Sequence, residues 1–143
     1  MEILEKVKSL LPEKAVTRVE LEGSELIVYT KDREFFRSSD ATIRDVVREI
    51  KKRIEIRLEK NLLPDEDATT EKIKQIVPQD ANIKNIYYEP ERSIVIIAAE
   101  KPGLVIGKGG ETFRNIRAET YWIPRIERVP AIKSDIVESI RKV

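Results

Sequence analysis

An internal repeat is the feature that most narrows the folds open to this chain of 143 residues. Four elements occur twice in the same order, at an offset that drifts only from 66 to 71 residues. The pairs are 7–15 with 73–81, 19–29 with 86–97, 43–46 with 113–116, and 54–58 with 125–129. A duplication explains this ordered series better than chance similarity between two amphipathic segments.

Each copy is predicted to run helix, strand, strand, helical region, strand, because apolar residues recur with helical spacing or in β-rich runs joined by Gly- or Pro-containing turns. The repeat predicts an α+β chain with domains at 1–62 and 70–130. In the linker between them, Thr69 or Thr70 is expected to cap the next helix. Residues 131–143 predict an amphipathic C-terminal helix, whose apolar positions are Ile132, Ile136, Val137, Ile140 and Val143.

The composition suits a globular protein with a modest core, since 41% of the residues are hydrophobic and 37% are charged. No apolar run approaches the roughly 18 to 20 residues that a membrane span needs, and the residues after Met1 do not read as a signal peptide. We therefore expect a cytoplasmic protein that has no membrane partner.

The chain contains neither cysteine nor histidine. A zinc hydrolase centre, a Ser-His-Asp triad and a Cys-His pair each require one of these residue types. Carboxylates are plentiful, but none stands apart from the solvated helix faces. We expect no catalytic residue, no metal site and no cofactor in this chain.

Four of the five glycines lie in 103–110, which reads GLVIGKGG. A phosphate-binding P-loop requires four residues between its glycines and a hydroxyl after its lysine. Here three residues separate Gly103 from Gly107, and Gly109 follows the lysine. The apolar turn 104–106 also replaces the flexible arch, so the P-loop interpretation fails.

A helix, a Gly-x-x-Gly loop and a second helix fit the same stretch. Pro102 suits the first position of a helix, 107–110 interrupts it, and a second helix begins at Glu111. Glycines let another backbone approach closely, and the second helix presents free amides and its positive dipole end to the loop. A phosphodiester would lie against this surface, with Lys108 supplying positive charge.

The charge distribution agrees with an anionic ligand at the loop. Residues 61–100 carry four basic and eight acidic side chains, a balance of −4, whereas 101–133 carry seven basic and three acidic ones, a balance of +4. The glycine-rich loop lies in the basic stretch, which provides weak attraction for phosphate.

With VIGKGG at 105–110 between two helices and after a strand, the second copy resembles the KH family, whose loop clamps about four nucleotides of single strand. The preceding helix and strand resemble the type II order, α-β-β-α-α-β. The resemblance implies a three-stranded sheet with helices packed on it in each domain. It also implies an RNA-binding set of Val105, Ile106, Gly107, Lys108, Gly109, Gly110, Arg114 and Arg117.

The first copy departs from the KH pattern. In an ungapped alignment, residues 37–40 (RSSD) stand where GKGG stands. Without glycines a phosphate backbone approaches less closely, and Asp40 would repel it. Ser39 or Asp40 is expected to cap a helix that begins at Ala41. We interpret this copy as a degenerate KH-like domain with a mainly structural role.

The whole chain is similar to the N-terminal region of archaeal CPSF-like proteins. The similarity rests on the degenerate copy, on VIGKGGETFRNI at 105–116, and on the ending AETYWIPRIERVPAIKSDIVESIRKV. That family comprises β-CASP ribonucleases of the metallo-β-lactamase class, which act at RNA 3′ ends and in transcription termination. The resemblance implies a zinc-dependent nuclease domain downstream, with zinc belonging to that domain alone. It further implies U-rich single-stranded RNA as ligand, and the nuclease domain and the transcription machinery as partners.

Two functions stay open at this point. The chain is either an RNA-binding module that positions single strands for the nuclease, or a scaffold that docks the nuclease to the transcription machinery. Tyr121 and Trp122 either stack on bases or fill the core, and Arg114 and Arg117 either contact phosphates or form a solvated helix face. The intact GKGG loop in its basic stretch favours the RNA-binding module.

Overall fold

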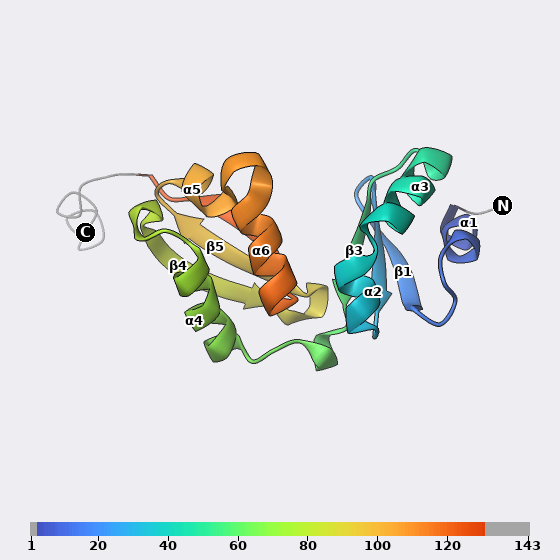
Figure 1. Ribbon diagram of the computed structural model, residues 1–143, viewed down its shortest axis with the longest axis horizontal. Coiled ribbons are helices and arrows are strands. Elements are labelled where there is room, and N and C mark those ends of the chain that lie inside the picture. Colours follow the sequence, from blue (N-terminus) through green and yellow to red (C-terminus); the bar gives the residue numbers. More distant parts are fainter. Residues whose placement is uncertain (1–2, 131–143) are drawn as a thin grey trace, which may run out of the picture.

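The computed structural model describes residues 3–130, which form two successive α+β domains (Figure 1). The first contains α1 (Ile3–Leu10), β1 (Val16–Glu22), β2 (Glu25–Thr30), α2 (Arg33–Ser38), α3 (Asp40–Ile50) and β3 (Ile54–Leu58). The second contains α4 (Glu66–Ile76), β4 (Ile83–Glu89), β5 (Ile94–Ala99), α5 (Pro102–Ile106), α6 (Glu111–Thr120) and β6 (Ile123–Arg128). The predicted α-β-β-α-α-β order is thus confirmed in both domains. The predicted C-terminal helix lies outside the described residues.

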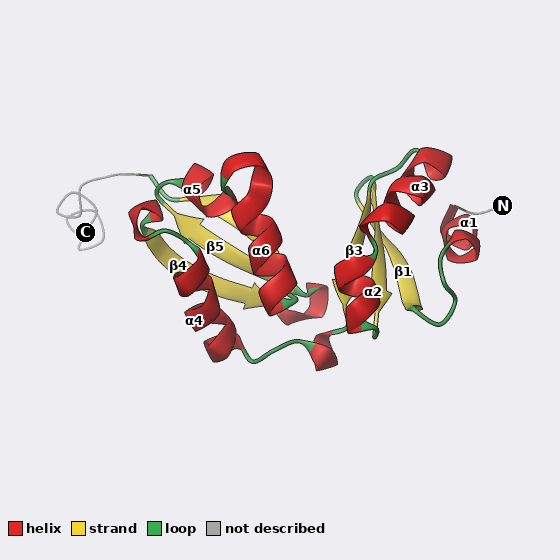
Figure 2. Cartoon of the chain, in the orientation of Figure 1, coloured by secondary structure: helices red, strands yellow, loops and turns green. Residues whose placement is uncertain are grey.

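Both sheets have the same topology. Their strand orders are β1-β2-β3 and β4-β5-β6, with the first pair antiparallel and the second pair parallel. A parallel pair requires a crossover connection, which α2 with α3 and α5 with α6 supply. Helices cover one face of each sheet (Figure 2). None of the helices between residues 3 and 130 has both the length and the apolar character that a membrane span requires.

The duplication extends to small details of the backbone. The antiparallel pairing shifts register between Val16 and Arg18 in one domain and between Ile83 and Asn85 in the other. Each residue of the first pair lies 67 positions before its equivalent in the second. Helices α3 and α6 each end in a residue with left-handed conformation, which is Lys51 in one case and Tyr121 in the other. A shared ancestor explains these matches better than independent convergence.

Equivalent side chains form the two cores. Phe36 from α2 and Val105 from α5 are both fully buried, and Val46 from α3 matches the buried Ile116 from α6. Each packs against the inward face of its own sheet. Burial of side chains of this size stabilises a fold by about 1.5 to 3 kcal/mol each, so these helices are held to the sheet mainly by packing.

One predicted helix start is wrong, and another differs by one residue. Helix α4 begins at Glu66, because the carboxylate of Asp65 accepts a hydrogen bond from the amide of Ala68 at 3.0 Å; Thr69 and Thr70 therefore lie inside the helix. Helix α3 begins at Asp40 rather than Ala41. Ser39 occupies the N-cap position, as expected, but its side chain makes no capping hydrogen bond.

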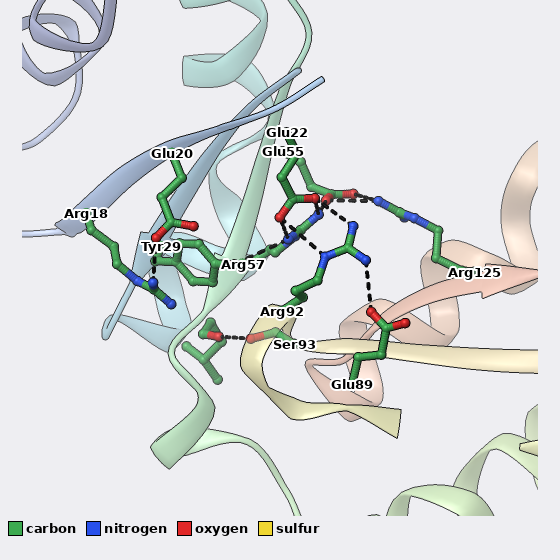
Figure 3. A network of polar contacts seen from close by, with 11 residues as sticks. Arg18, Glu20, Glu22, Tyr29, Glu55, Arg57, Glu89, Arg92, Ser93 and Arg125 are labelled. Carbon is green, nitrogen blue, oxygen red and sulfur yellow. Dashed lines mark hydrogen bonds and ion pairs between the residues drawn. The ribbon is translucent and has the colours of Figure 1, made fainter. Parts of the chain in front are cut away.

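One part of the contact between the domains is formed around Arg57 on β3, the outer strand of the first sheet. Arg57 on β3 is 1% exposed. Its guanidinium donates to both carboxylate oxygens of Glu22, at 2.6 and 3.0 Å, to Glu55 at 2.8 Å, and to the hydroxyl of Tyr29 at 3.3 Å (Figure 3). A buried arginine is tolerated when its charge and donors are satisfied in this way.

The same two carboxylates bind arginines of the second domain. Arg92 donates to Glu22 at 2.8 Å, and Arg125 donates to Glu55 at 2.9 and 3.0 Å (Figure 3). Close by, the buried hydroxyl of Ser93 donates to the Leu58 carbonyl at 2.5 Å. Residues of both domains therefore share one charge network, and we expect the interface to depend on ionised carboxylates.

Acid should weaken this interface within a defined range. Hydrogen bonds from Arg57 and then Arg92 lower the pKa of Glu22 from 4.5 to about 2. A carboxylate with a lowered pKa adds stability that is complete above its unfolded-state value and is lost as pH falls through the folded-state value. We expect the thermal unfolding temperature, followed by circular dichroism, to fall between pH 4.5 and pH 2.

Glu22→Gln should flatten this acid dependence, while Glu5→Gln, at an exposed position of α1, should leave it as in the parent. An acid profile of Glu22→Gln that runs parallel to the parent profile would show that Glu22 is not the group responsible.

Candidate nucleic-acid interface

The Gly107–Gly110 segment forms a short, exposed loop between α5 and α6. Gly107, Gly109 and Gly110 all have positive φ, at 81°, 63° and 78°. Residues with a Cβ rarely adopt this conformation, so the glycines are what allow the loop to turn so tightly. Lys108 and Gly109 are exposed at its tip, directly before the first turn of the 10-residue helix α6.

The glycines have different roles in this loop. A Cβ on Gly107 would lie 2.3 Å from the hydroxyl oxygen of Thr112 and 2.7 Å from its backbone nitrogen, whereas a Cβ on Gly109 would meet nothing within 4 Å. Gly107 thus allows the loop to pack onto α6. Gly109 presents an open backbone surface that a ligand can approach.

Arg114 holds the loop in place. Its Nη1 atom donates a hydrogen bond of 2.6 Å to the carbonyl of Gly109, and the side chain is exposed. A Cβ on Gly110 would lie 3.3 Å from the same nitrogen. The loop and the first turns of α6 therefore combine a lysine, an arginine and helix N-terminal amides, which together suit a phosphate.

The structure removes Val105 from the predicted binding surface. Its side chain is 0% exposed, because the single turn of α5 must anchor itself on the sheet and Val105 does so at the position equivalent to Phe36. Ile106 is half-buried beside the loop. Leu104, 38% exposed, is the more accessible apolar side chain of this turn.

Arg117 was predicted at the phosphate surface, but it lies between the domains. Its guanidinium carbon is 4.1 Å from the centre of the Phe36 ring, and Nη2 donates to the carbonyls of Phe36 and Ile56 at 3.3 and 3.5 Å. Burial lowers the pKa of Arg117, an effect that Asp40 and Glu55 partly offset. Arg117 therefore anchors α6 to the first domain and is not free for phosphate.

The aromatic candidates for base stacking also prove structural. Trp122 is 2% exposed, donates through Nε1 to the Pro64 carbonyl at 3.1 Å and packs edge-on against Tyr88. Tyr121 is half-buried, with its ring 5.7 Å from that of Phe36. The core interpretation of both residues is the correct one.

The first domain has no loop at the equivalent place. Only Ser39 separates α2 from α3, so residues 37 and 38 are helical and not counterparts of GKGG. The hydroxyl of Ser38 donates to the Glu34 carbonyl within α2, and Ser39 is 3% exposed. The ungapped alignment concealed a deletion, which leaves this domain without a backbone cradle.

The residues do not fit a zinc centre of the kind found in metallo-β-lactamase nucleases. Between residues 3 and 130 no group of three potential ligands among histidine, cysteine, aspartate and glutamate lies close enough to hold a metal ion. No step involving a metal is assigned to this chain.

Comparison with known families agrees with this geometry. Residues 68–122 match a family model described as a KH domain. Residues 1–63 match the model "Transcription termination factor FttA, KH domain". The chain therefore belongs to the KH family and consists of two KH domains in tandem.

Its relatives then identify a particular kind of KH protein. It is 44% identical to transcription termination factor FttA of Methanothermobacter thermautotrophicus over 146 aligned residues, and 41% identical to FttA of Thermococcus kodakarensis over 143. The alignments cover 99% of this chain but 23% and 22% of those proteins. The chain is thus homologous to about a fifth of FttA, and the resemblance to archaeal CPSF-like proteins is confirmed.

One solved structure, described as the crystal structure of APE1850, is similar to this chain with 17% sequence identity and a TM-score of 0.35. The match covers 81% of this chain and 85% of the APE1850 chain.

Proposed function

We propose that this chain binds single-stranded RNA through the Gly107–Gly110 loop of its second KH domain. The observation that carries the proposal is the exposed loop itself, with three glycines at positive φ, Lys108 at its tip and α6 behind it. In KH domains such a loop clamps the backbone of about four nucleotides. Ile106 and Leu104 supply the apolar surface beside the proposed site.

For the whole protein we propose a role in transcription termination, the role after which its relatives are named. In this proposal the module delivers U-rich single strands to a zinc-dependent nuclease domain elsewhere in the protein, in contact with the transcription machinery in the cytoplasm. The nuclease rests on the resemblance to archaeal CPSF-like proteins.

A scaffold function is the second candidate. It is favoured by the first domain, which lacks the loop and uses Phe36 and Ile56 to contact Arg117 of the second domain. That contact is made without residues of the Gly107–Gly110 loop. The two functions are compatible. Substitutions in the Gly107–Gly110 loop distinguish them, because only the RNA-binding function requires that loop.

Binding to single-stranded RNA should weaken as salt increases. Phosphate contacts release counterions, so log K should fall against log salt by about 0.7 for each phosphate neutralised on a single strand. The slope should be shallow because the loop contacts few phosphates. Fluorescence anisotropy with labelled homopolymers measures both this slope and the preference for uridine.

Duplex RNA of equal length is the control, since a KH loop clamps a strand whose bases are unpaired. An affinity that does not change with salt, or equal affinity for the duplex, would contradict the backbone clamp.

A further inference from the structure

A groove runs between α3 of the first domain and α6 of the second. Its volume is about 740 Å³. Its walls are α3, the outer strand β3 and α6, and Ile43 and Val47 contribute apolar surface. Both side chains are half-buried.

Arginine dominates the charge of this groove. Four arginines that line it are exposed, and within residues 3–130 none of them pairs with a carboxylate; they are Arg37, Arg44, Arg53 and Arg114. Unpaired guanidinium groups gathered in one groove favour a polyanion, and the planar guanidinium matches the oxygens of a phosphate.

Three carboxylates also line the groove. Glu55 is already bound by Arg57 and Arg125. Glu25 and Asp40 are left to oppose the four unpaired arginines, so positive charge prevails.

Arg114 connects the groove to the Gly107–Gly110 loop. Arg114 both donates to the Gly109 carbonyl and lines the groove, and Asn115 and Ala118 continue the same wall along α6. A strand held at the loop therefore has the groove as its next surface. The position of Arg114 between the loop and the groove favours nucleic acid over an acidic protein segment as the occupant.

We propose that single-stranded RNA longer than the loop can clamp extends along α6 into this groove and contacts Arg37, Arg44 and Arg53 of the first domain. The inference rests on the proposed function, because the same strand is held at the loop. It gives the first domain a direct role in binding although that domain has no loop of its own. The ligand class is an unpaired RNA strand that spans both domains.

The test compares two RNAs, one of about four nucleotides, the length that a KH loop clamps, and one twice as long. Arg44→Glu/Arg53→Glu reverses two charges in the groove. Lys8→Glu/Arg48→Glu, which makes the same change in charge at exposed positions outside it, is the matched control. Circular dichroism checks that both variants are folded.

We expect the parent to bind the longer RNA more tightly than the shorter one. The groove variant should lose at least tenfold in affinity for the longer RNA and keep its affinity for the shorter one within about twofold, and the control should keep both. If the groove variant loses contacts with two phosphates, the slope of log K against log salt for the longer RNA should become shallower by about 1.4.

The outcomes separate the two proposals. If the parent binds neither RNA, the proposed function and the groove both fail. If the parent binds the short RNA but gains nothing from length, or if the groove variant behaves like the control, only the groove inference is overturned. If the groove variant still binds the longer RNA but no longer binds poly-glutamate, the groove belongs to an acidic protein partner. That result would also overturn the groove inference.

Discussion

Replacing Lys108 and Gly109 together with aspartate should weaken single-stranded RNA binding at least tenfold. The change puts two negative charges where the proposed phosphate lies and removes the lysine that attracts it. A tenfold loss corresponds to about 1.4 kcal/mol, which is within reach of one charge-assisted contact plus repulsion. Anisotropy titration with the RNA used for the parent measures the effect.

The fold should survive this double substitution. Both positions are exposed, and a Cβ on Gly109 would meet no atom within 4 Å. Because Gly109 has a positive φ, its replacement with aspartate should lower the free energy of unfolding by about 1 kcal/mol. A matched variant, Gln79→Asp/Lys84→Asp, makes the same change in charge at two exposed positions of the second domain and should bind like the parent. RNA binding by the loop variant at the parental level would exclude the clamp and favour the scaffold.

Arg57→Met should reduce the free energy of unfolding by about 3 kcal/mol, the scale expected when one member of a buried charge network is removed. Methionine fills part of the volume but leaves Glu22 and Glu55 without their central partner. Urea denaturation should show a lower midpoint. Arg48→Met, at an exposed position of α3, should change stability by no more than about 0.5 kcal/mol.

A second substitution tests the reason for that loss. Adding Glu22→Gln to Arg57→Met neutralises one carboxylate that has lost its central partner and retains only Arg92, and it should recover part of the stability. If Arg57→Met alone is as stable as the parent, the network does not hold the domains together.

The duplication and the order of elements could be read from the sequence because they depend on local signals. Pro12 and Pro78 recur after matching amphipathic helices, and the turns of both hairpins contain glycine or proline. The GKGG loop was equally readable, since glycine clusters rarely serve any purpose but backbone geometry. These features need no knowledge of the neighbouring domain.

The roles that sequence reasoning missed depend on packing between the domains. Arg117 follows the helical spacing of a solvated face, and only the adjacent Phe36 makes that face an interface. Arg57 alternates with Ile56 and Leu58 as an ordinary outward residue of a strand would, although it is buried. The groove arginines come from two domains, so no local sequence motif predicts that they lie together.

The deletion at Ser39 was hidden for another reason. Anchoring the repeat at Ile43 and Phe113 placed the RSSD segment opposite GKGG, and nothing in the four letters marks them as the end of one helix and the start of the next. Val105 was likewise indistinguishable from Leu104 and Ile106, because a single helical turn has too few residues to define its buried side.

The short connection between the domains has a consequence for selectivity. Strand β3 ends at Leu58 and α4 begins at Glu66, and the Lys60–Leu62 turn occupies part of that link. Tandem domains on long flexible tethers can slide relative to each other, so they accept ligands of many lengths at the expense of ordering entropy. Here the interface sets the spacing in advance. Any ligand that contacts both domains meets two surfaces at a preset separation. The two domains therefore select RNA by the length of its unpaired stretch.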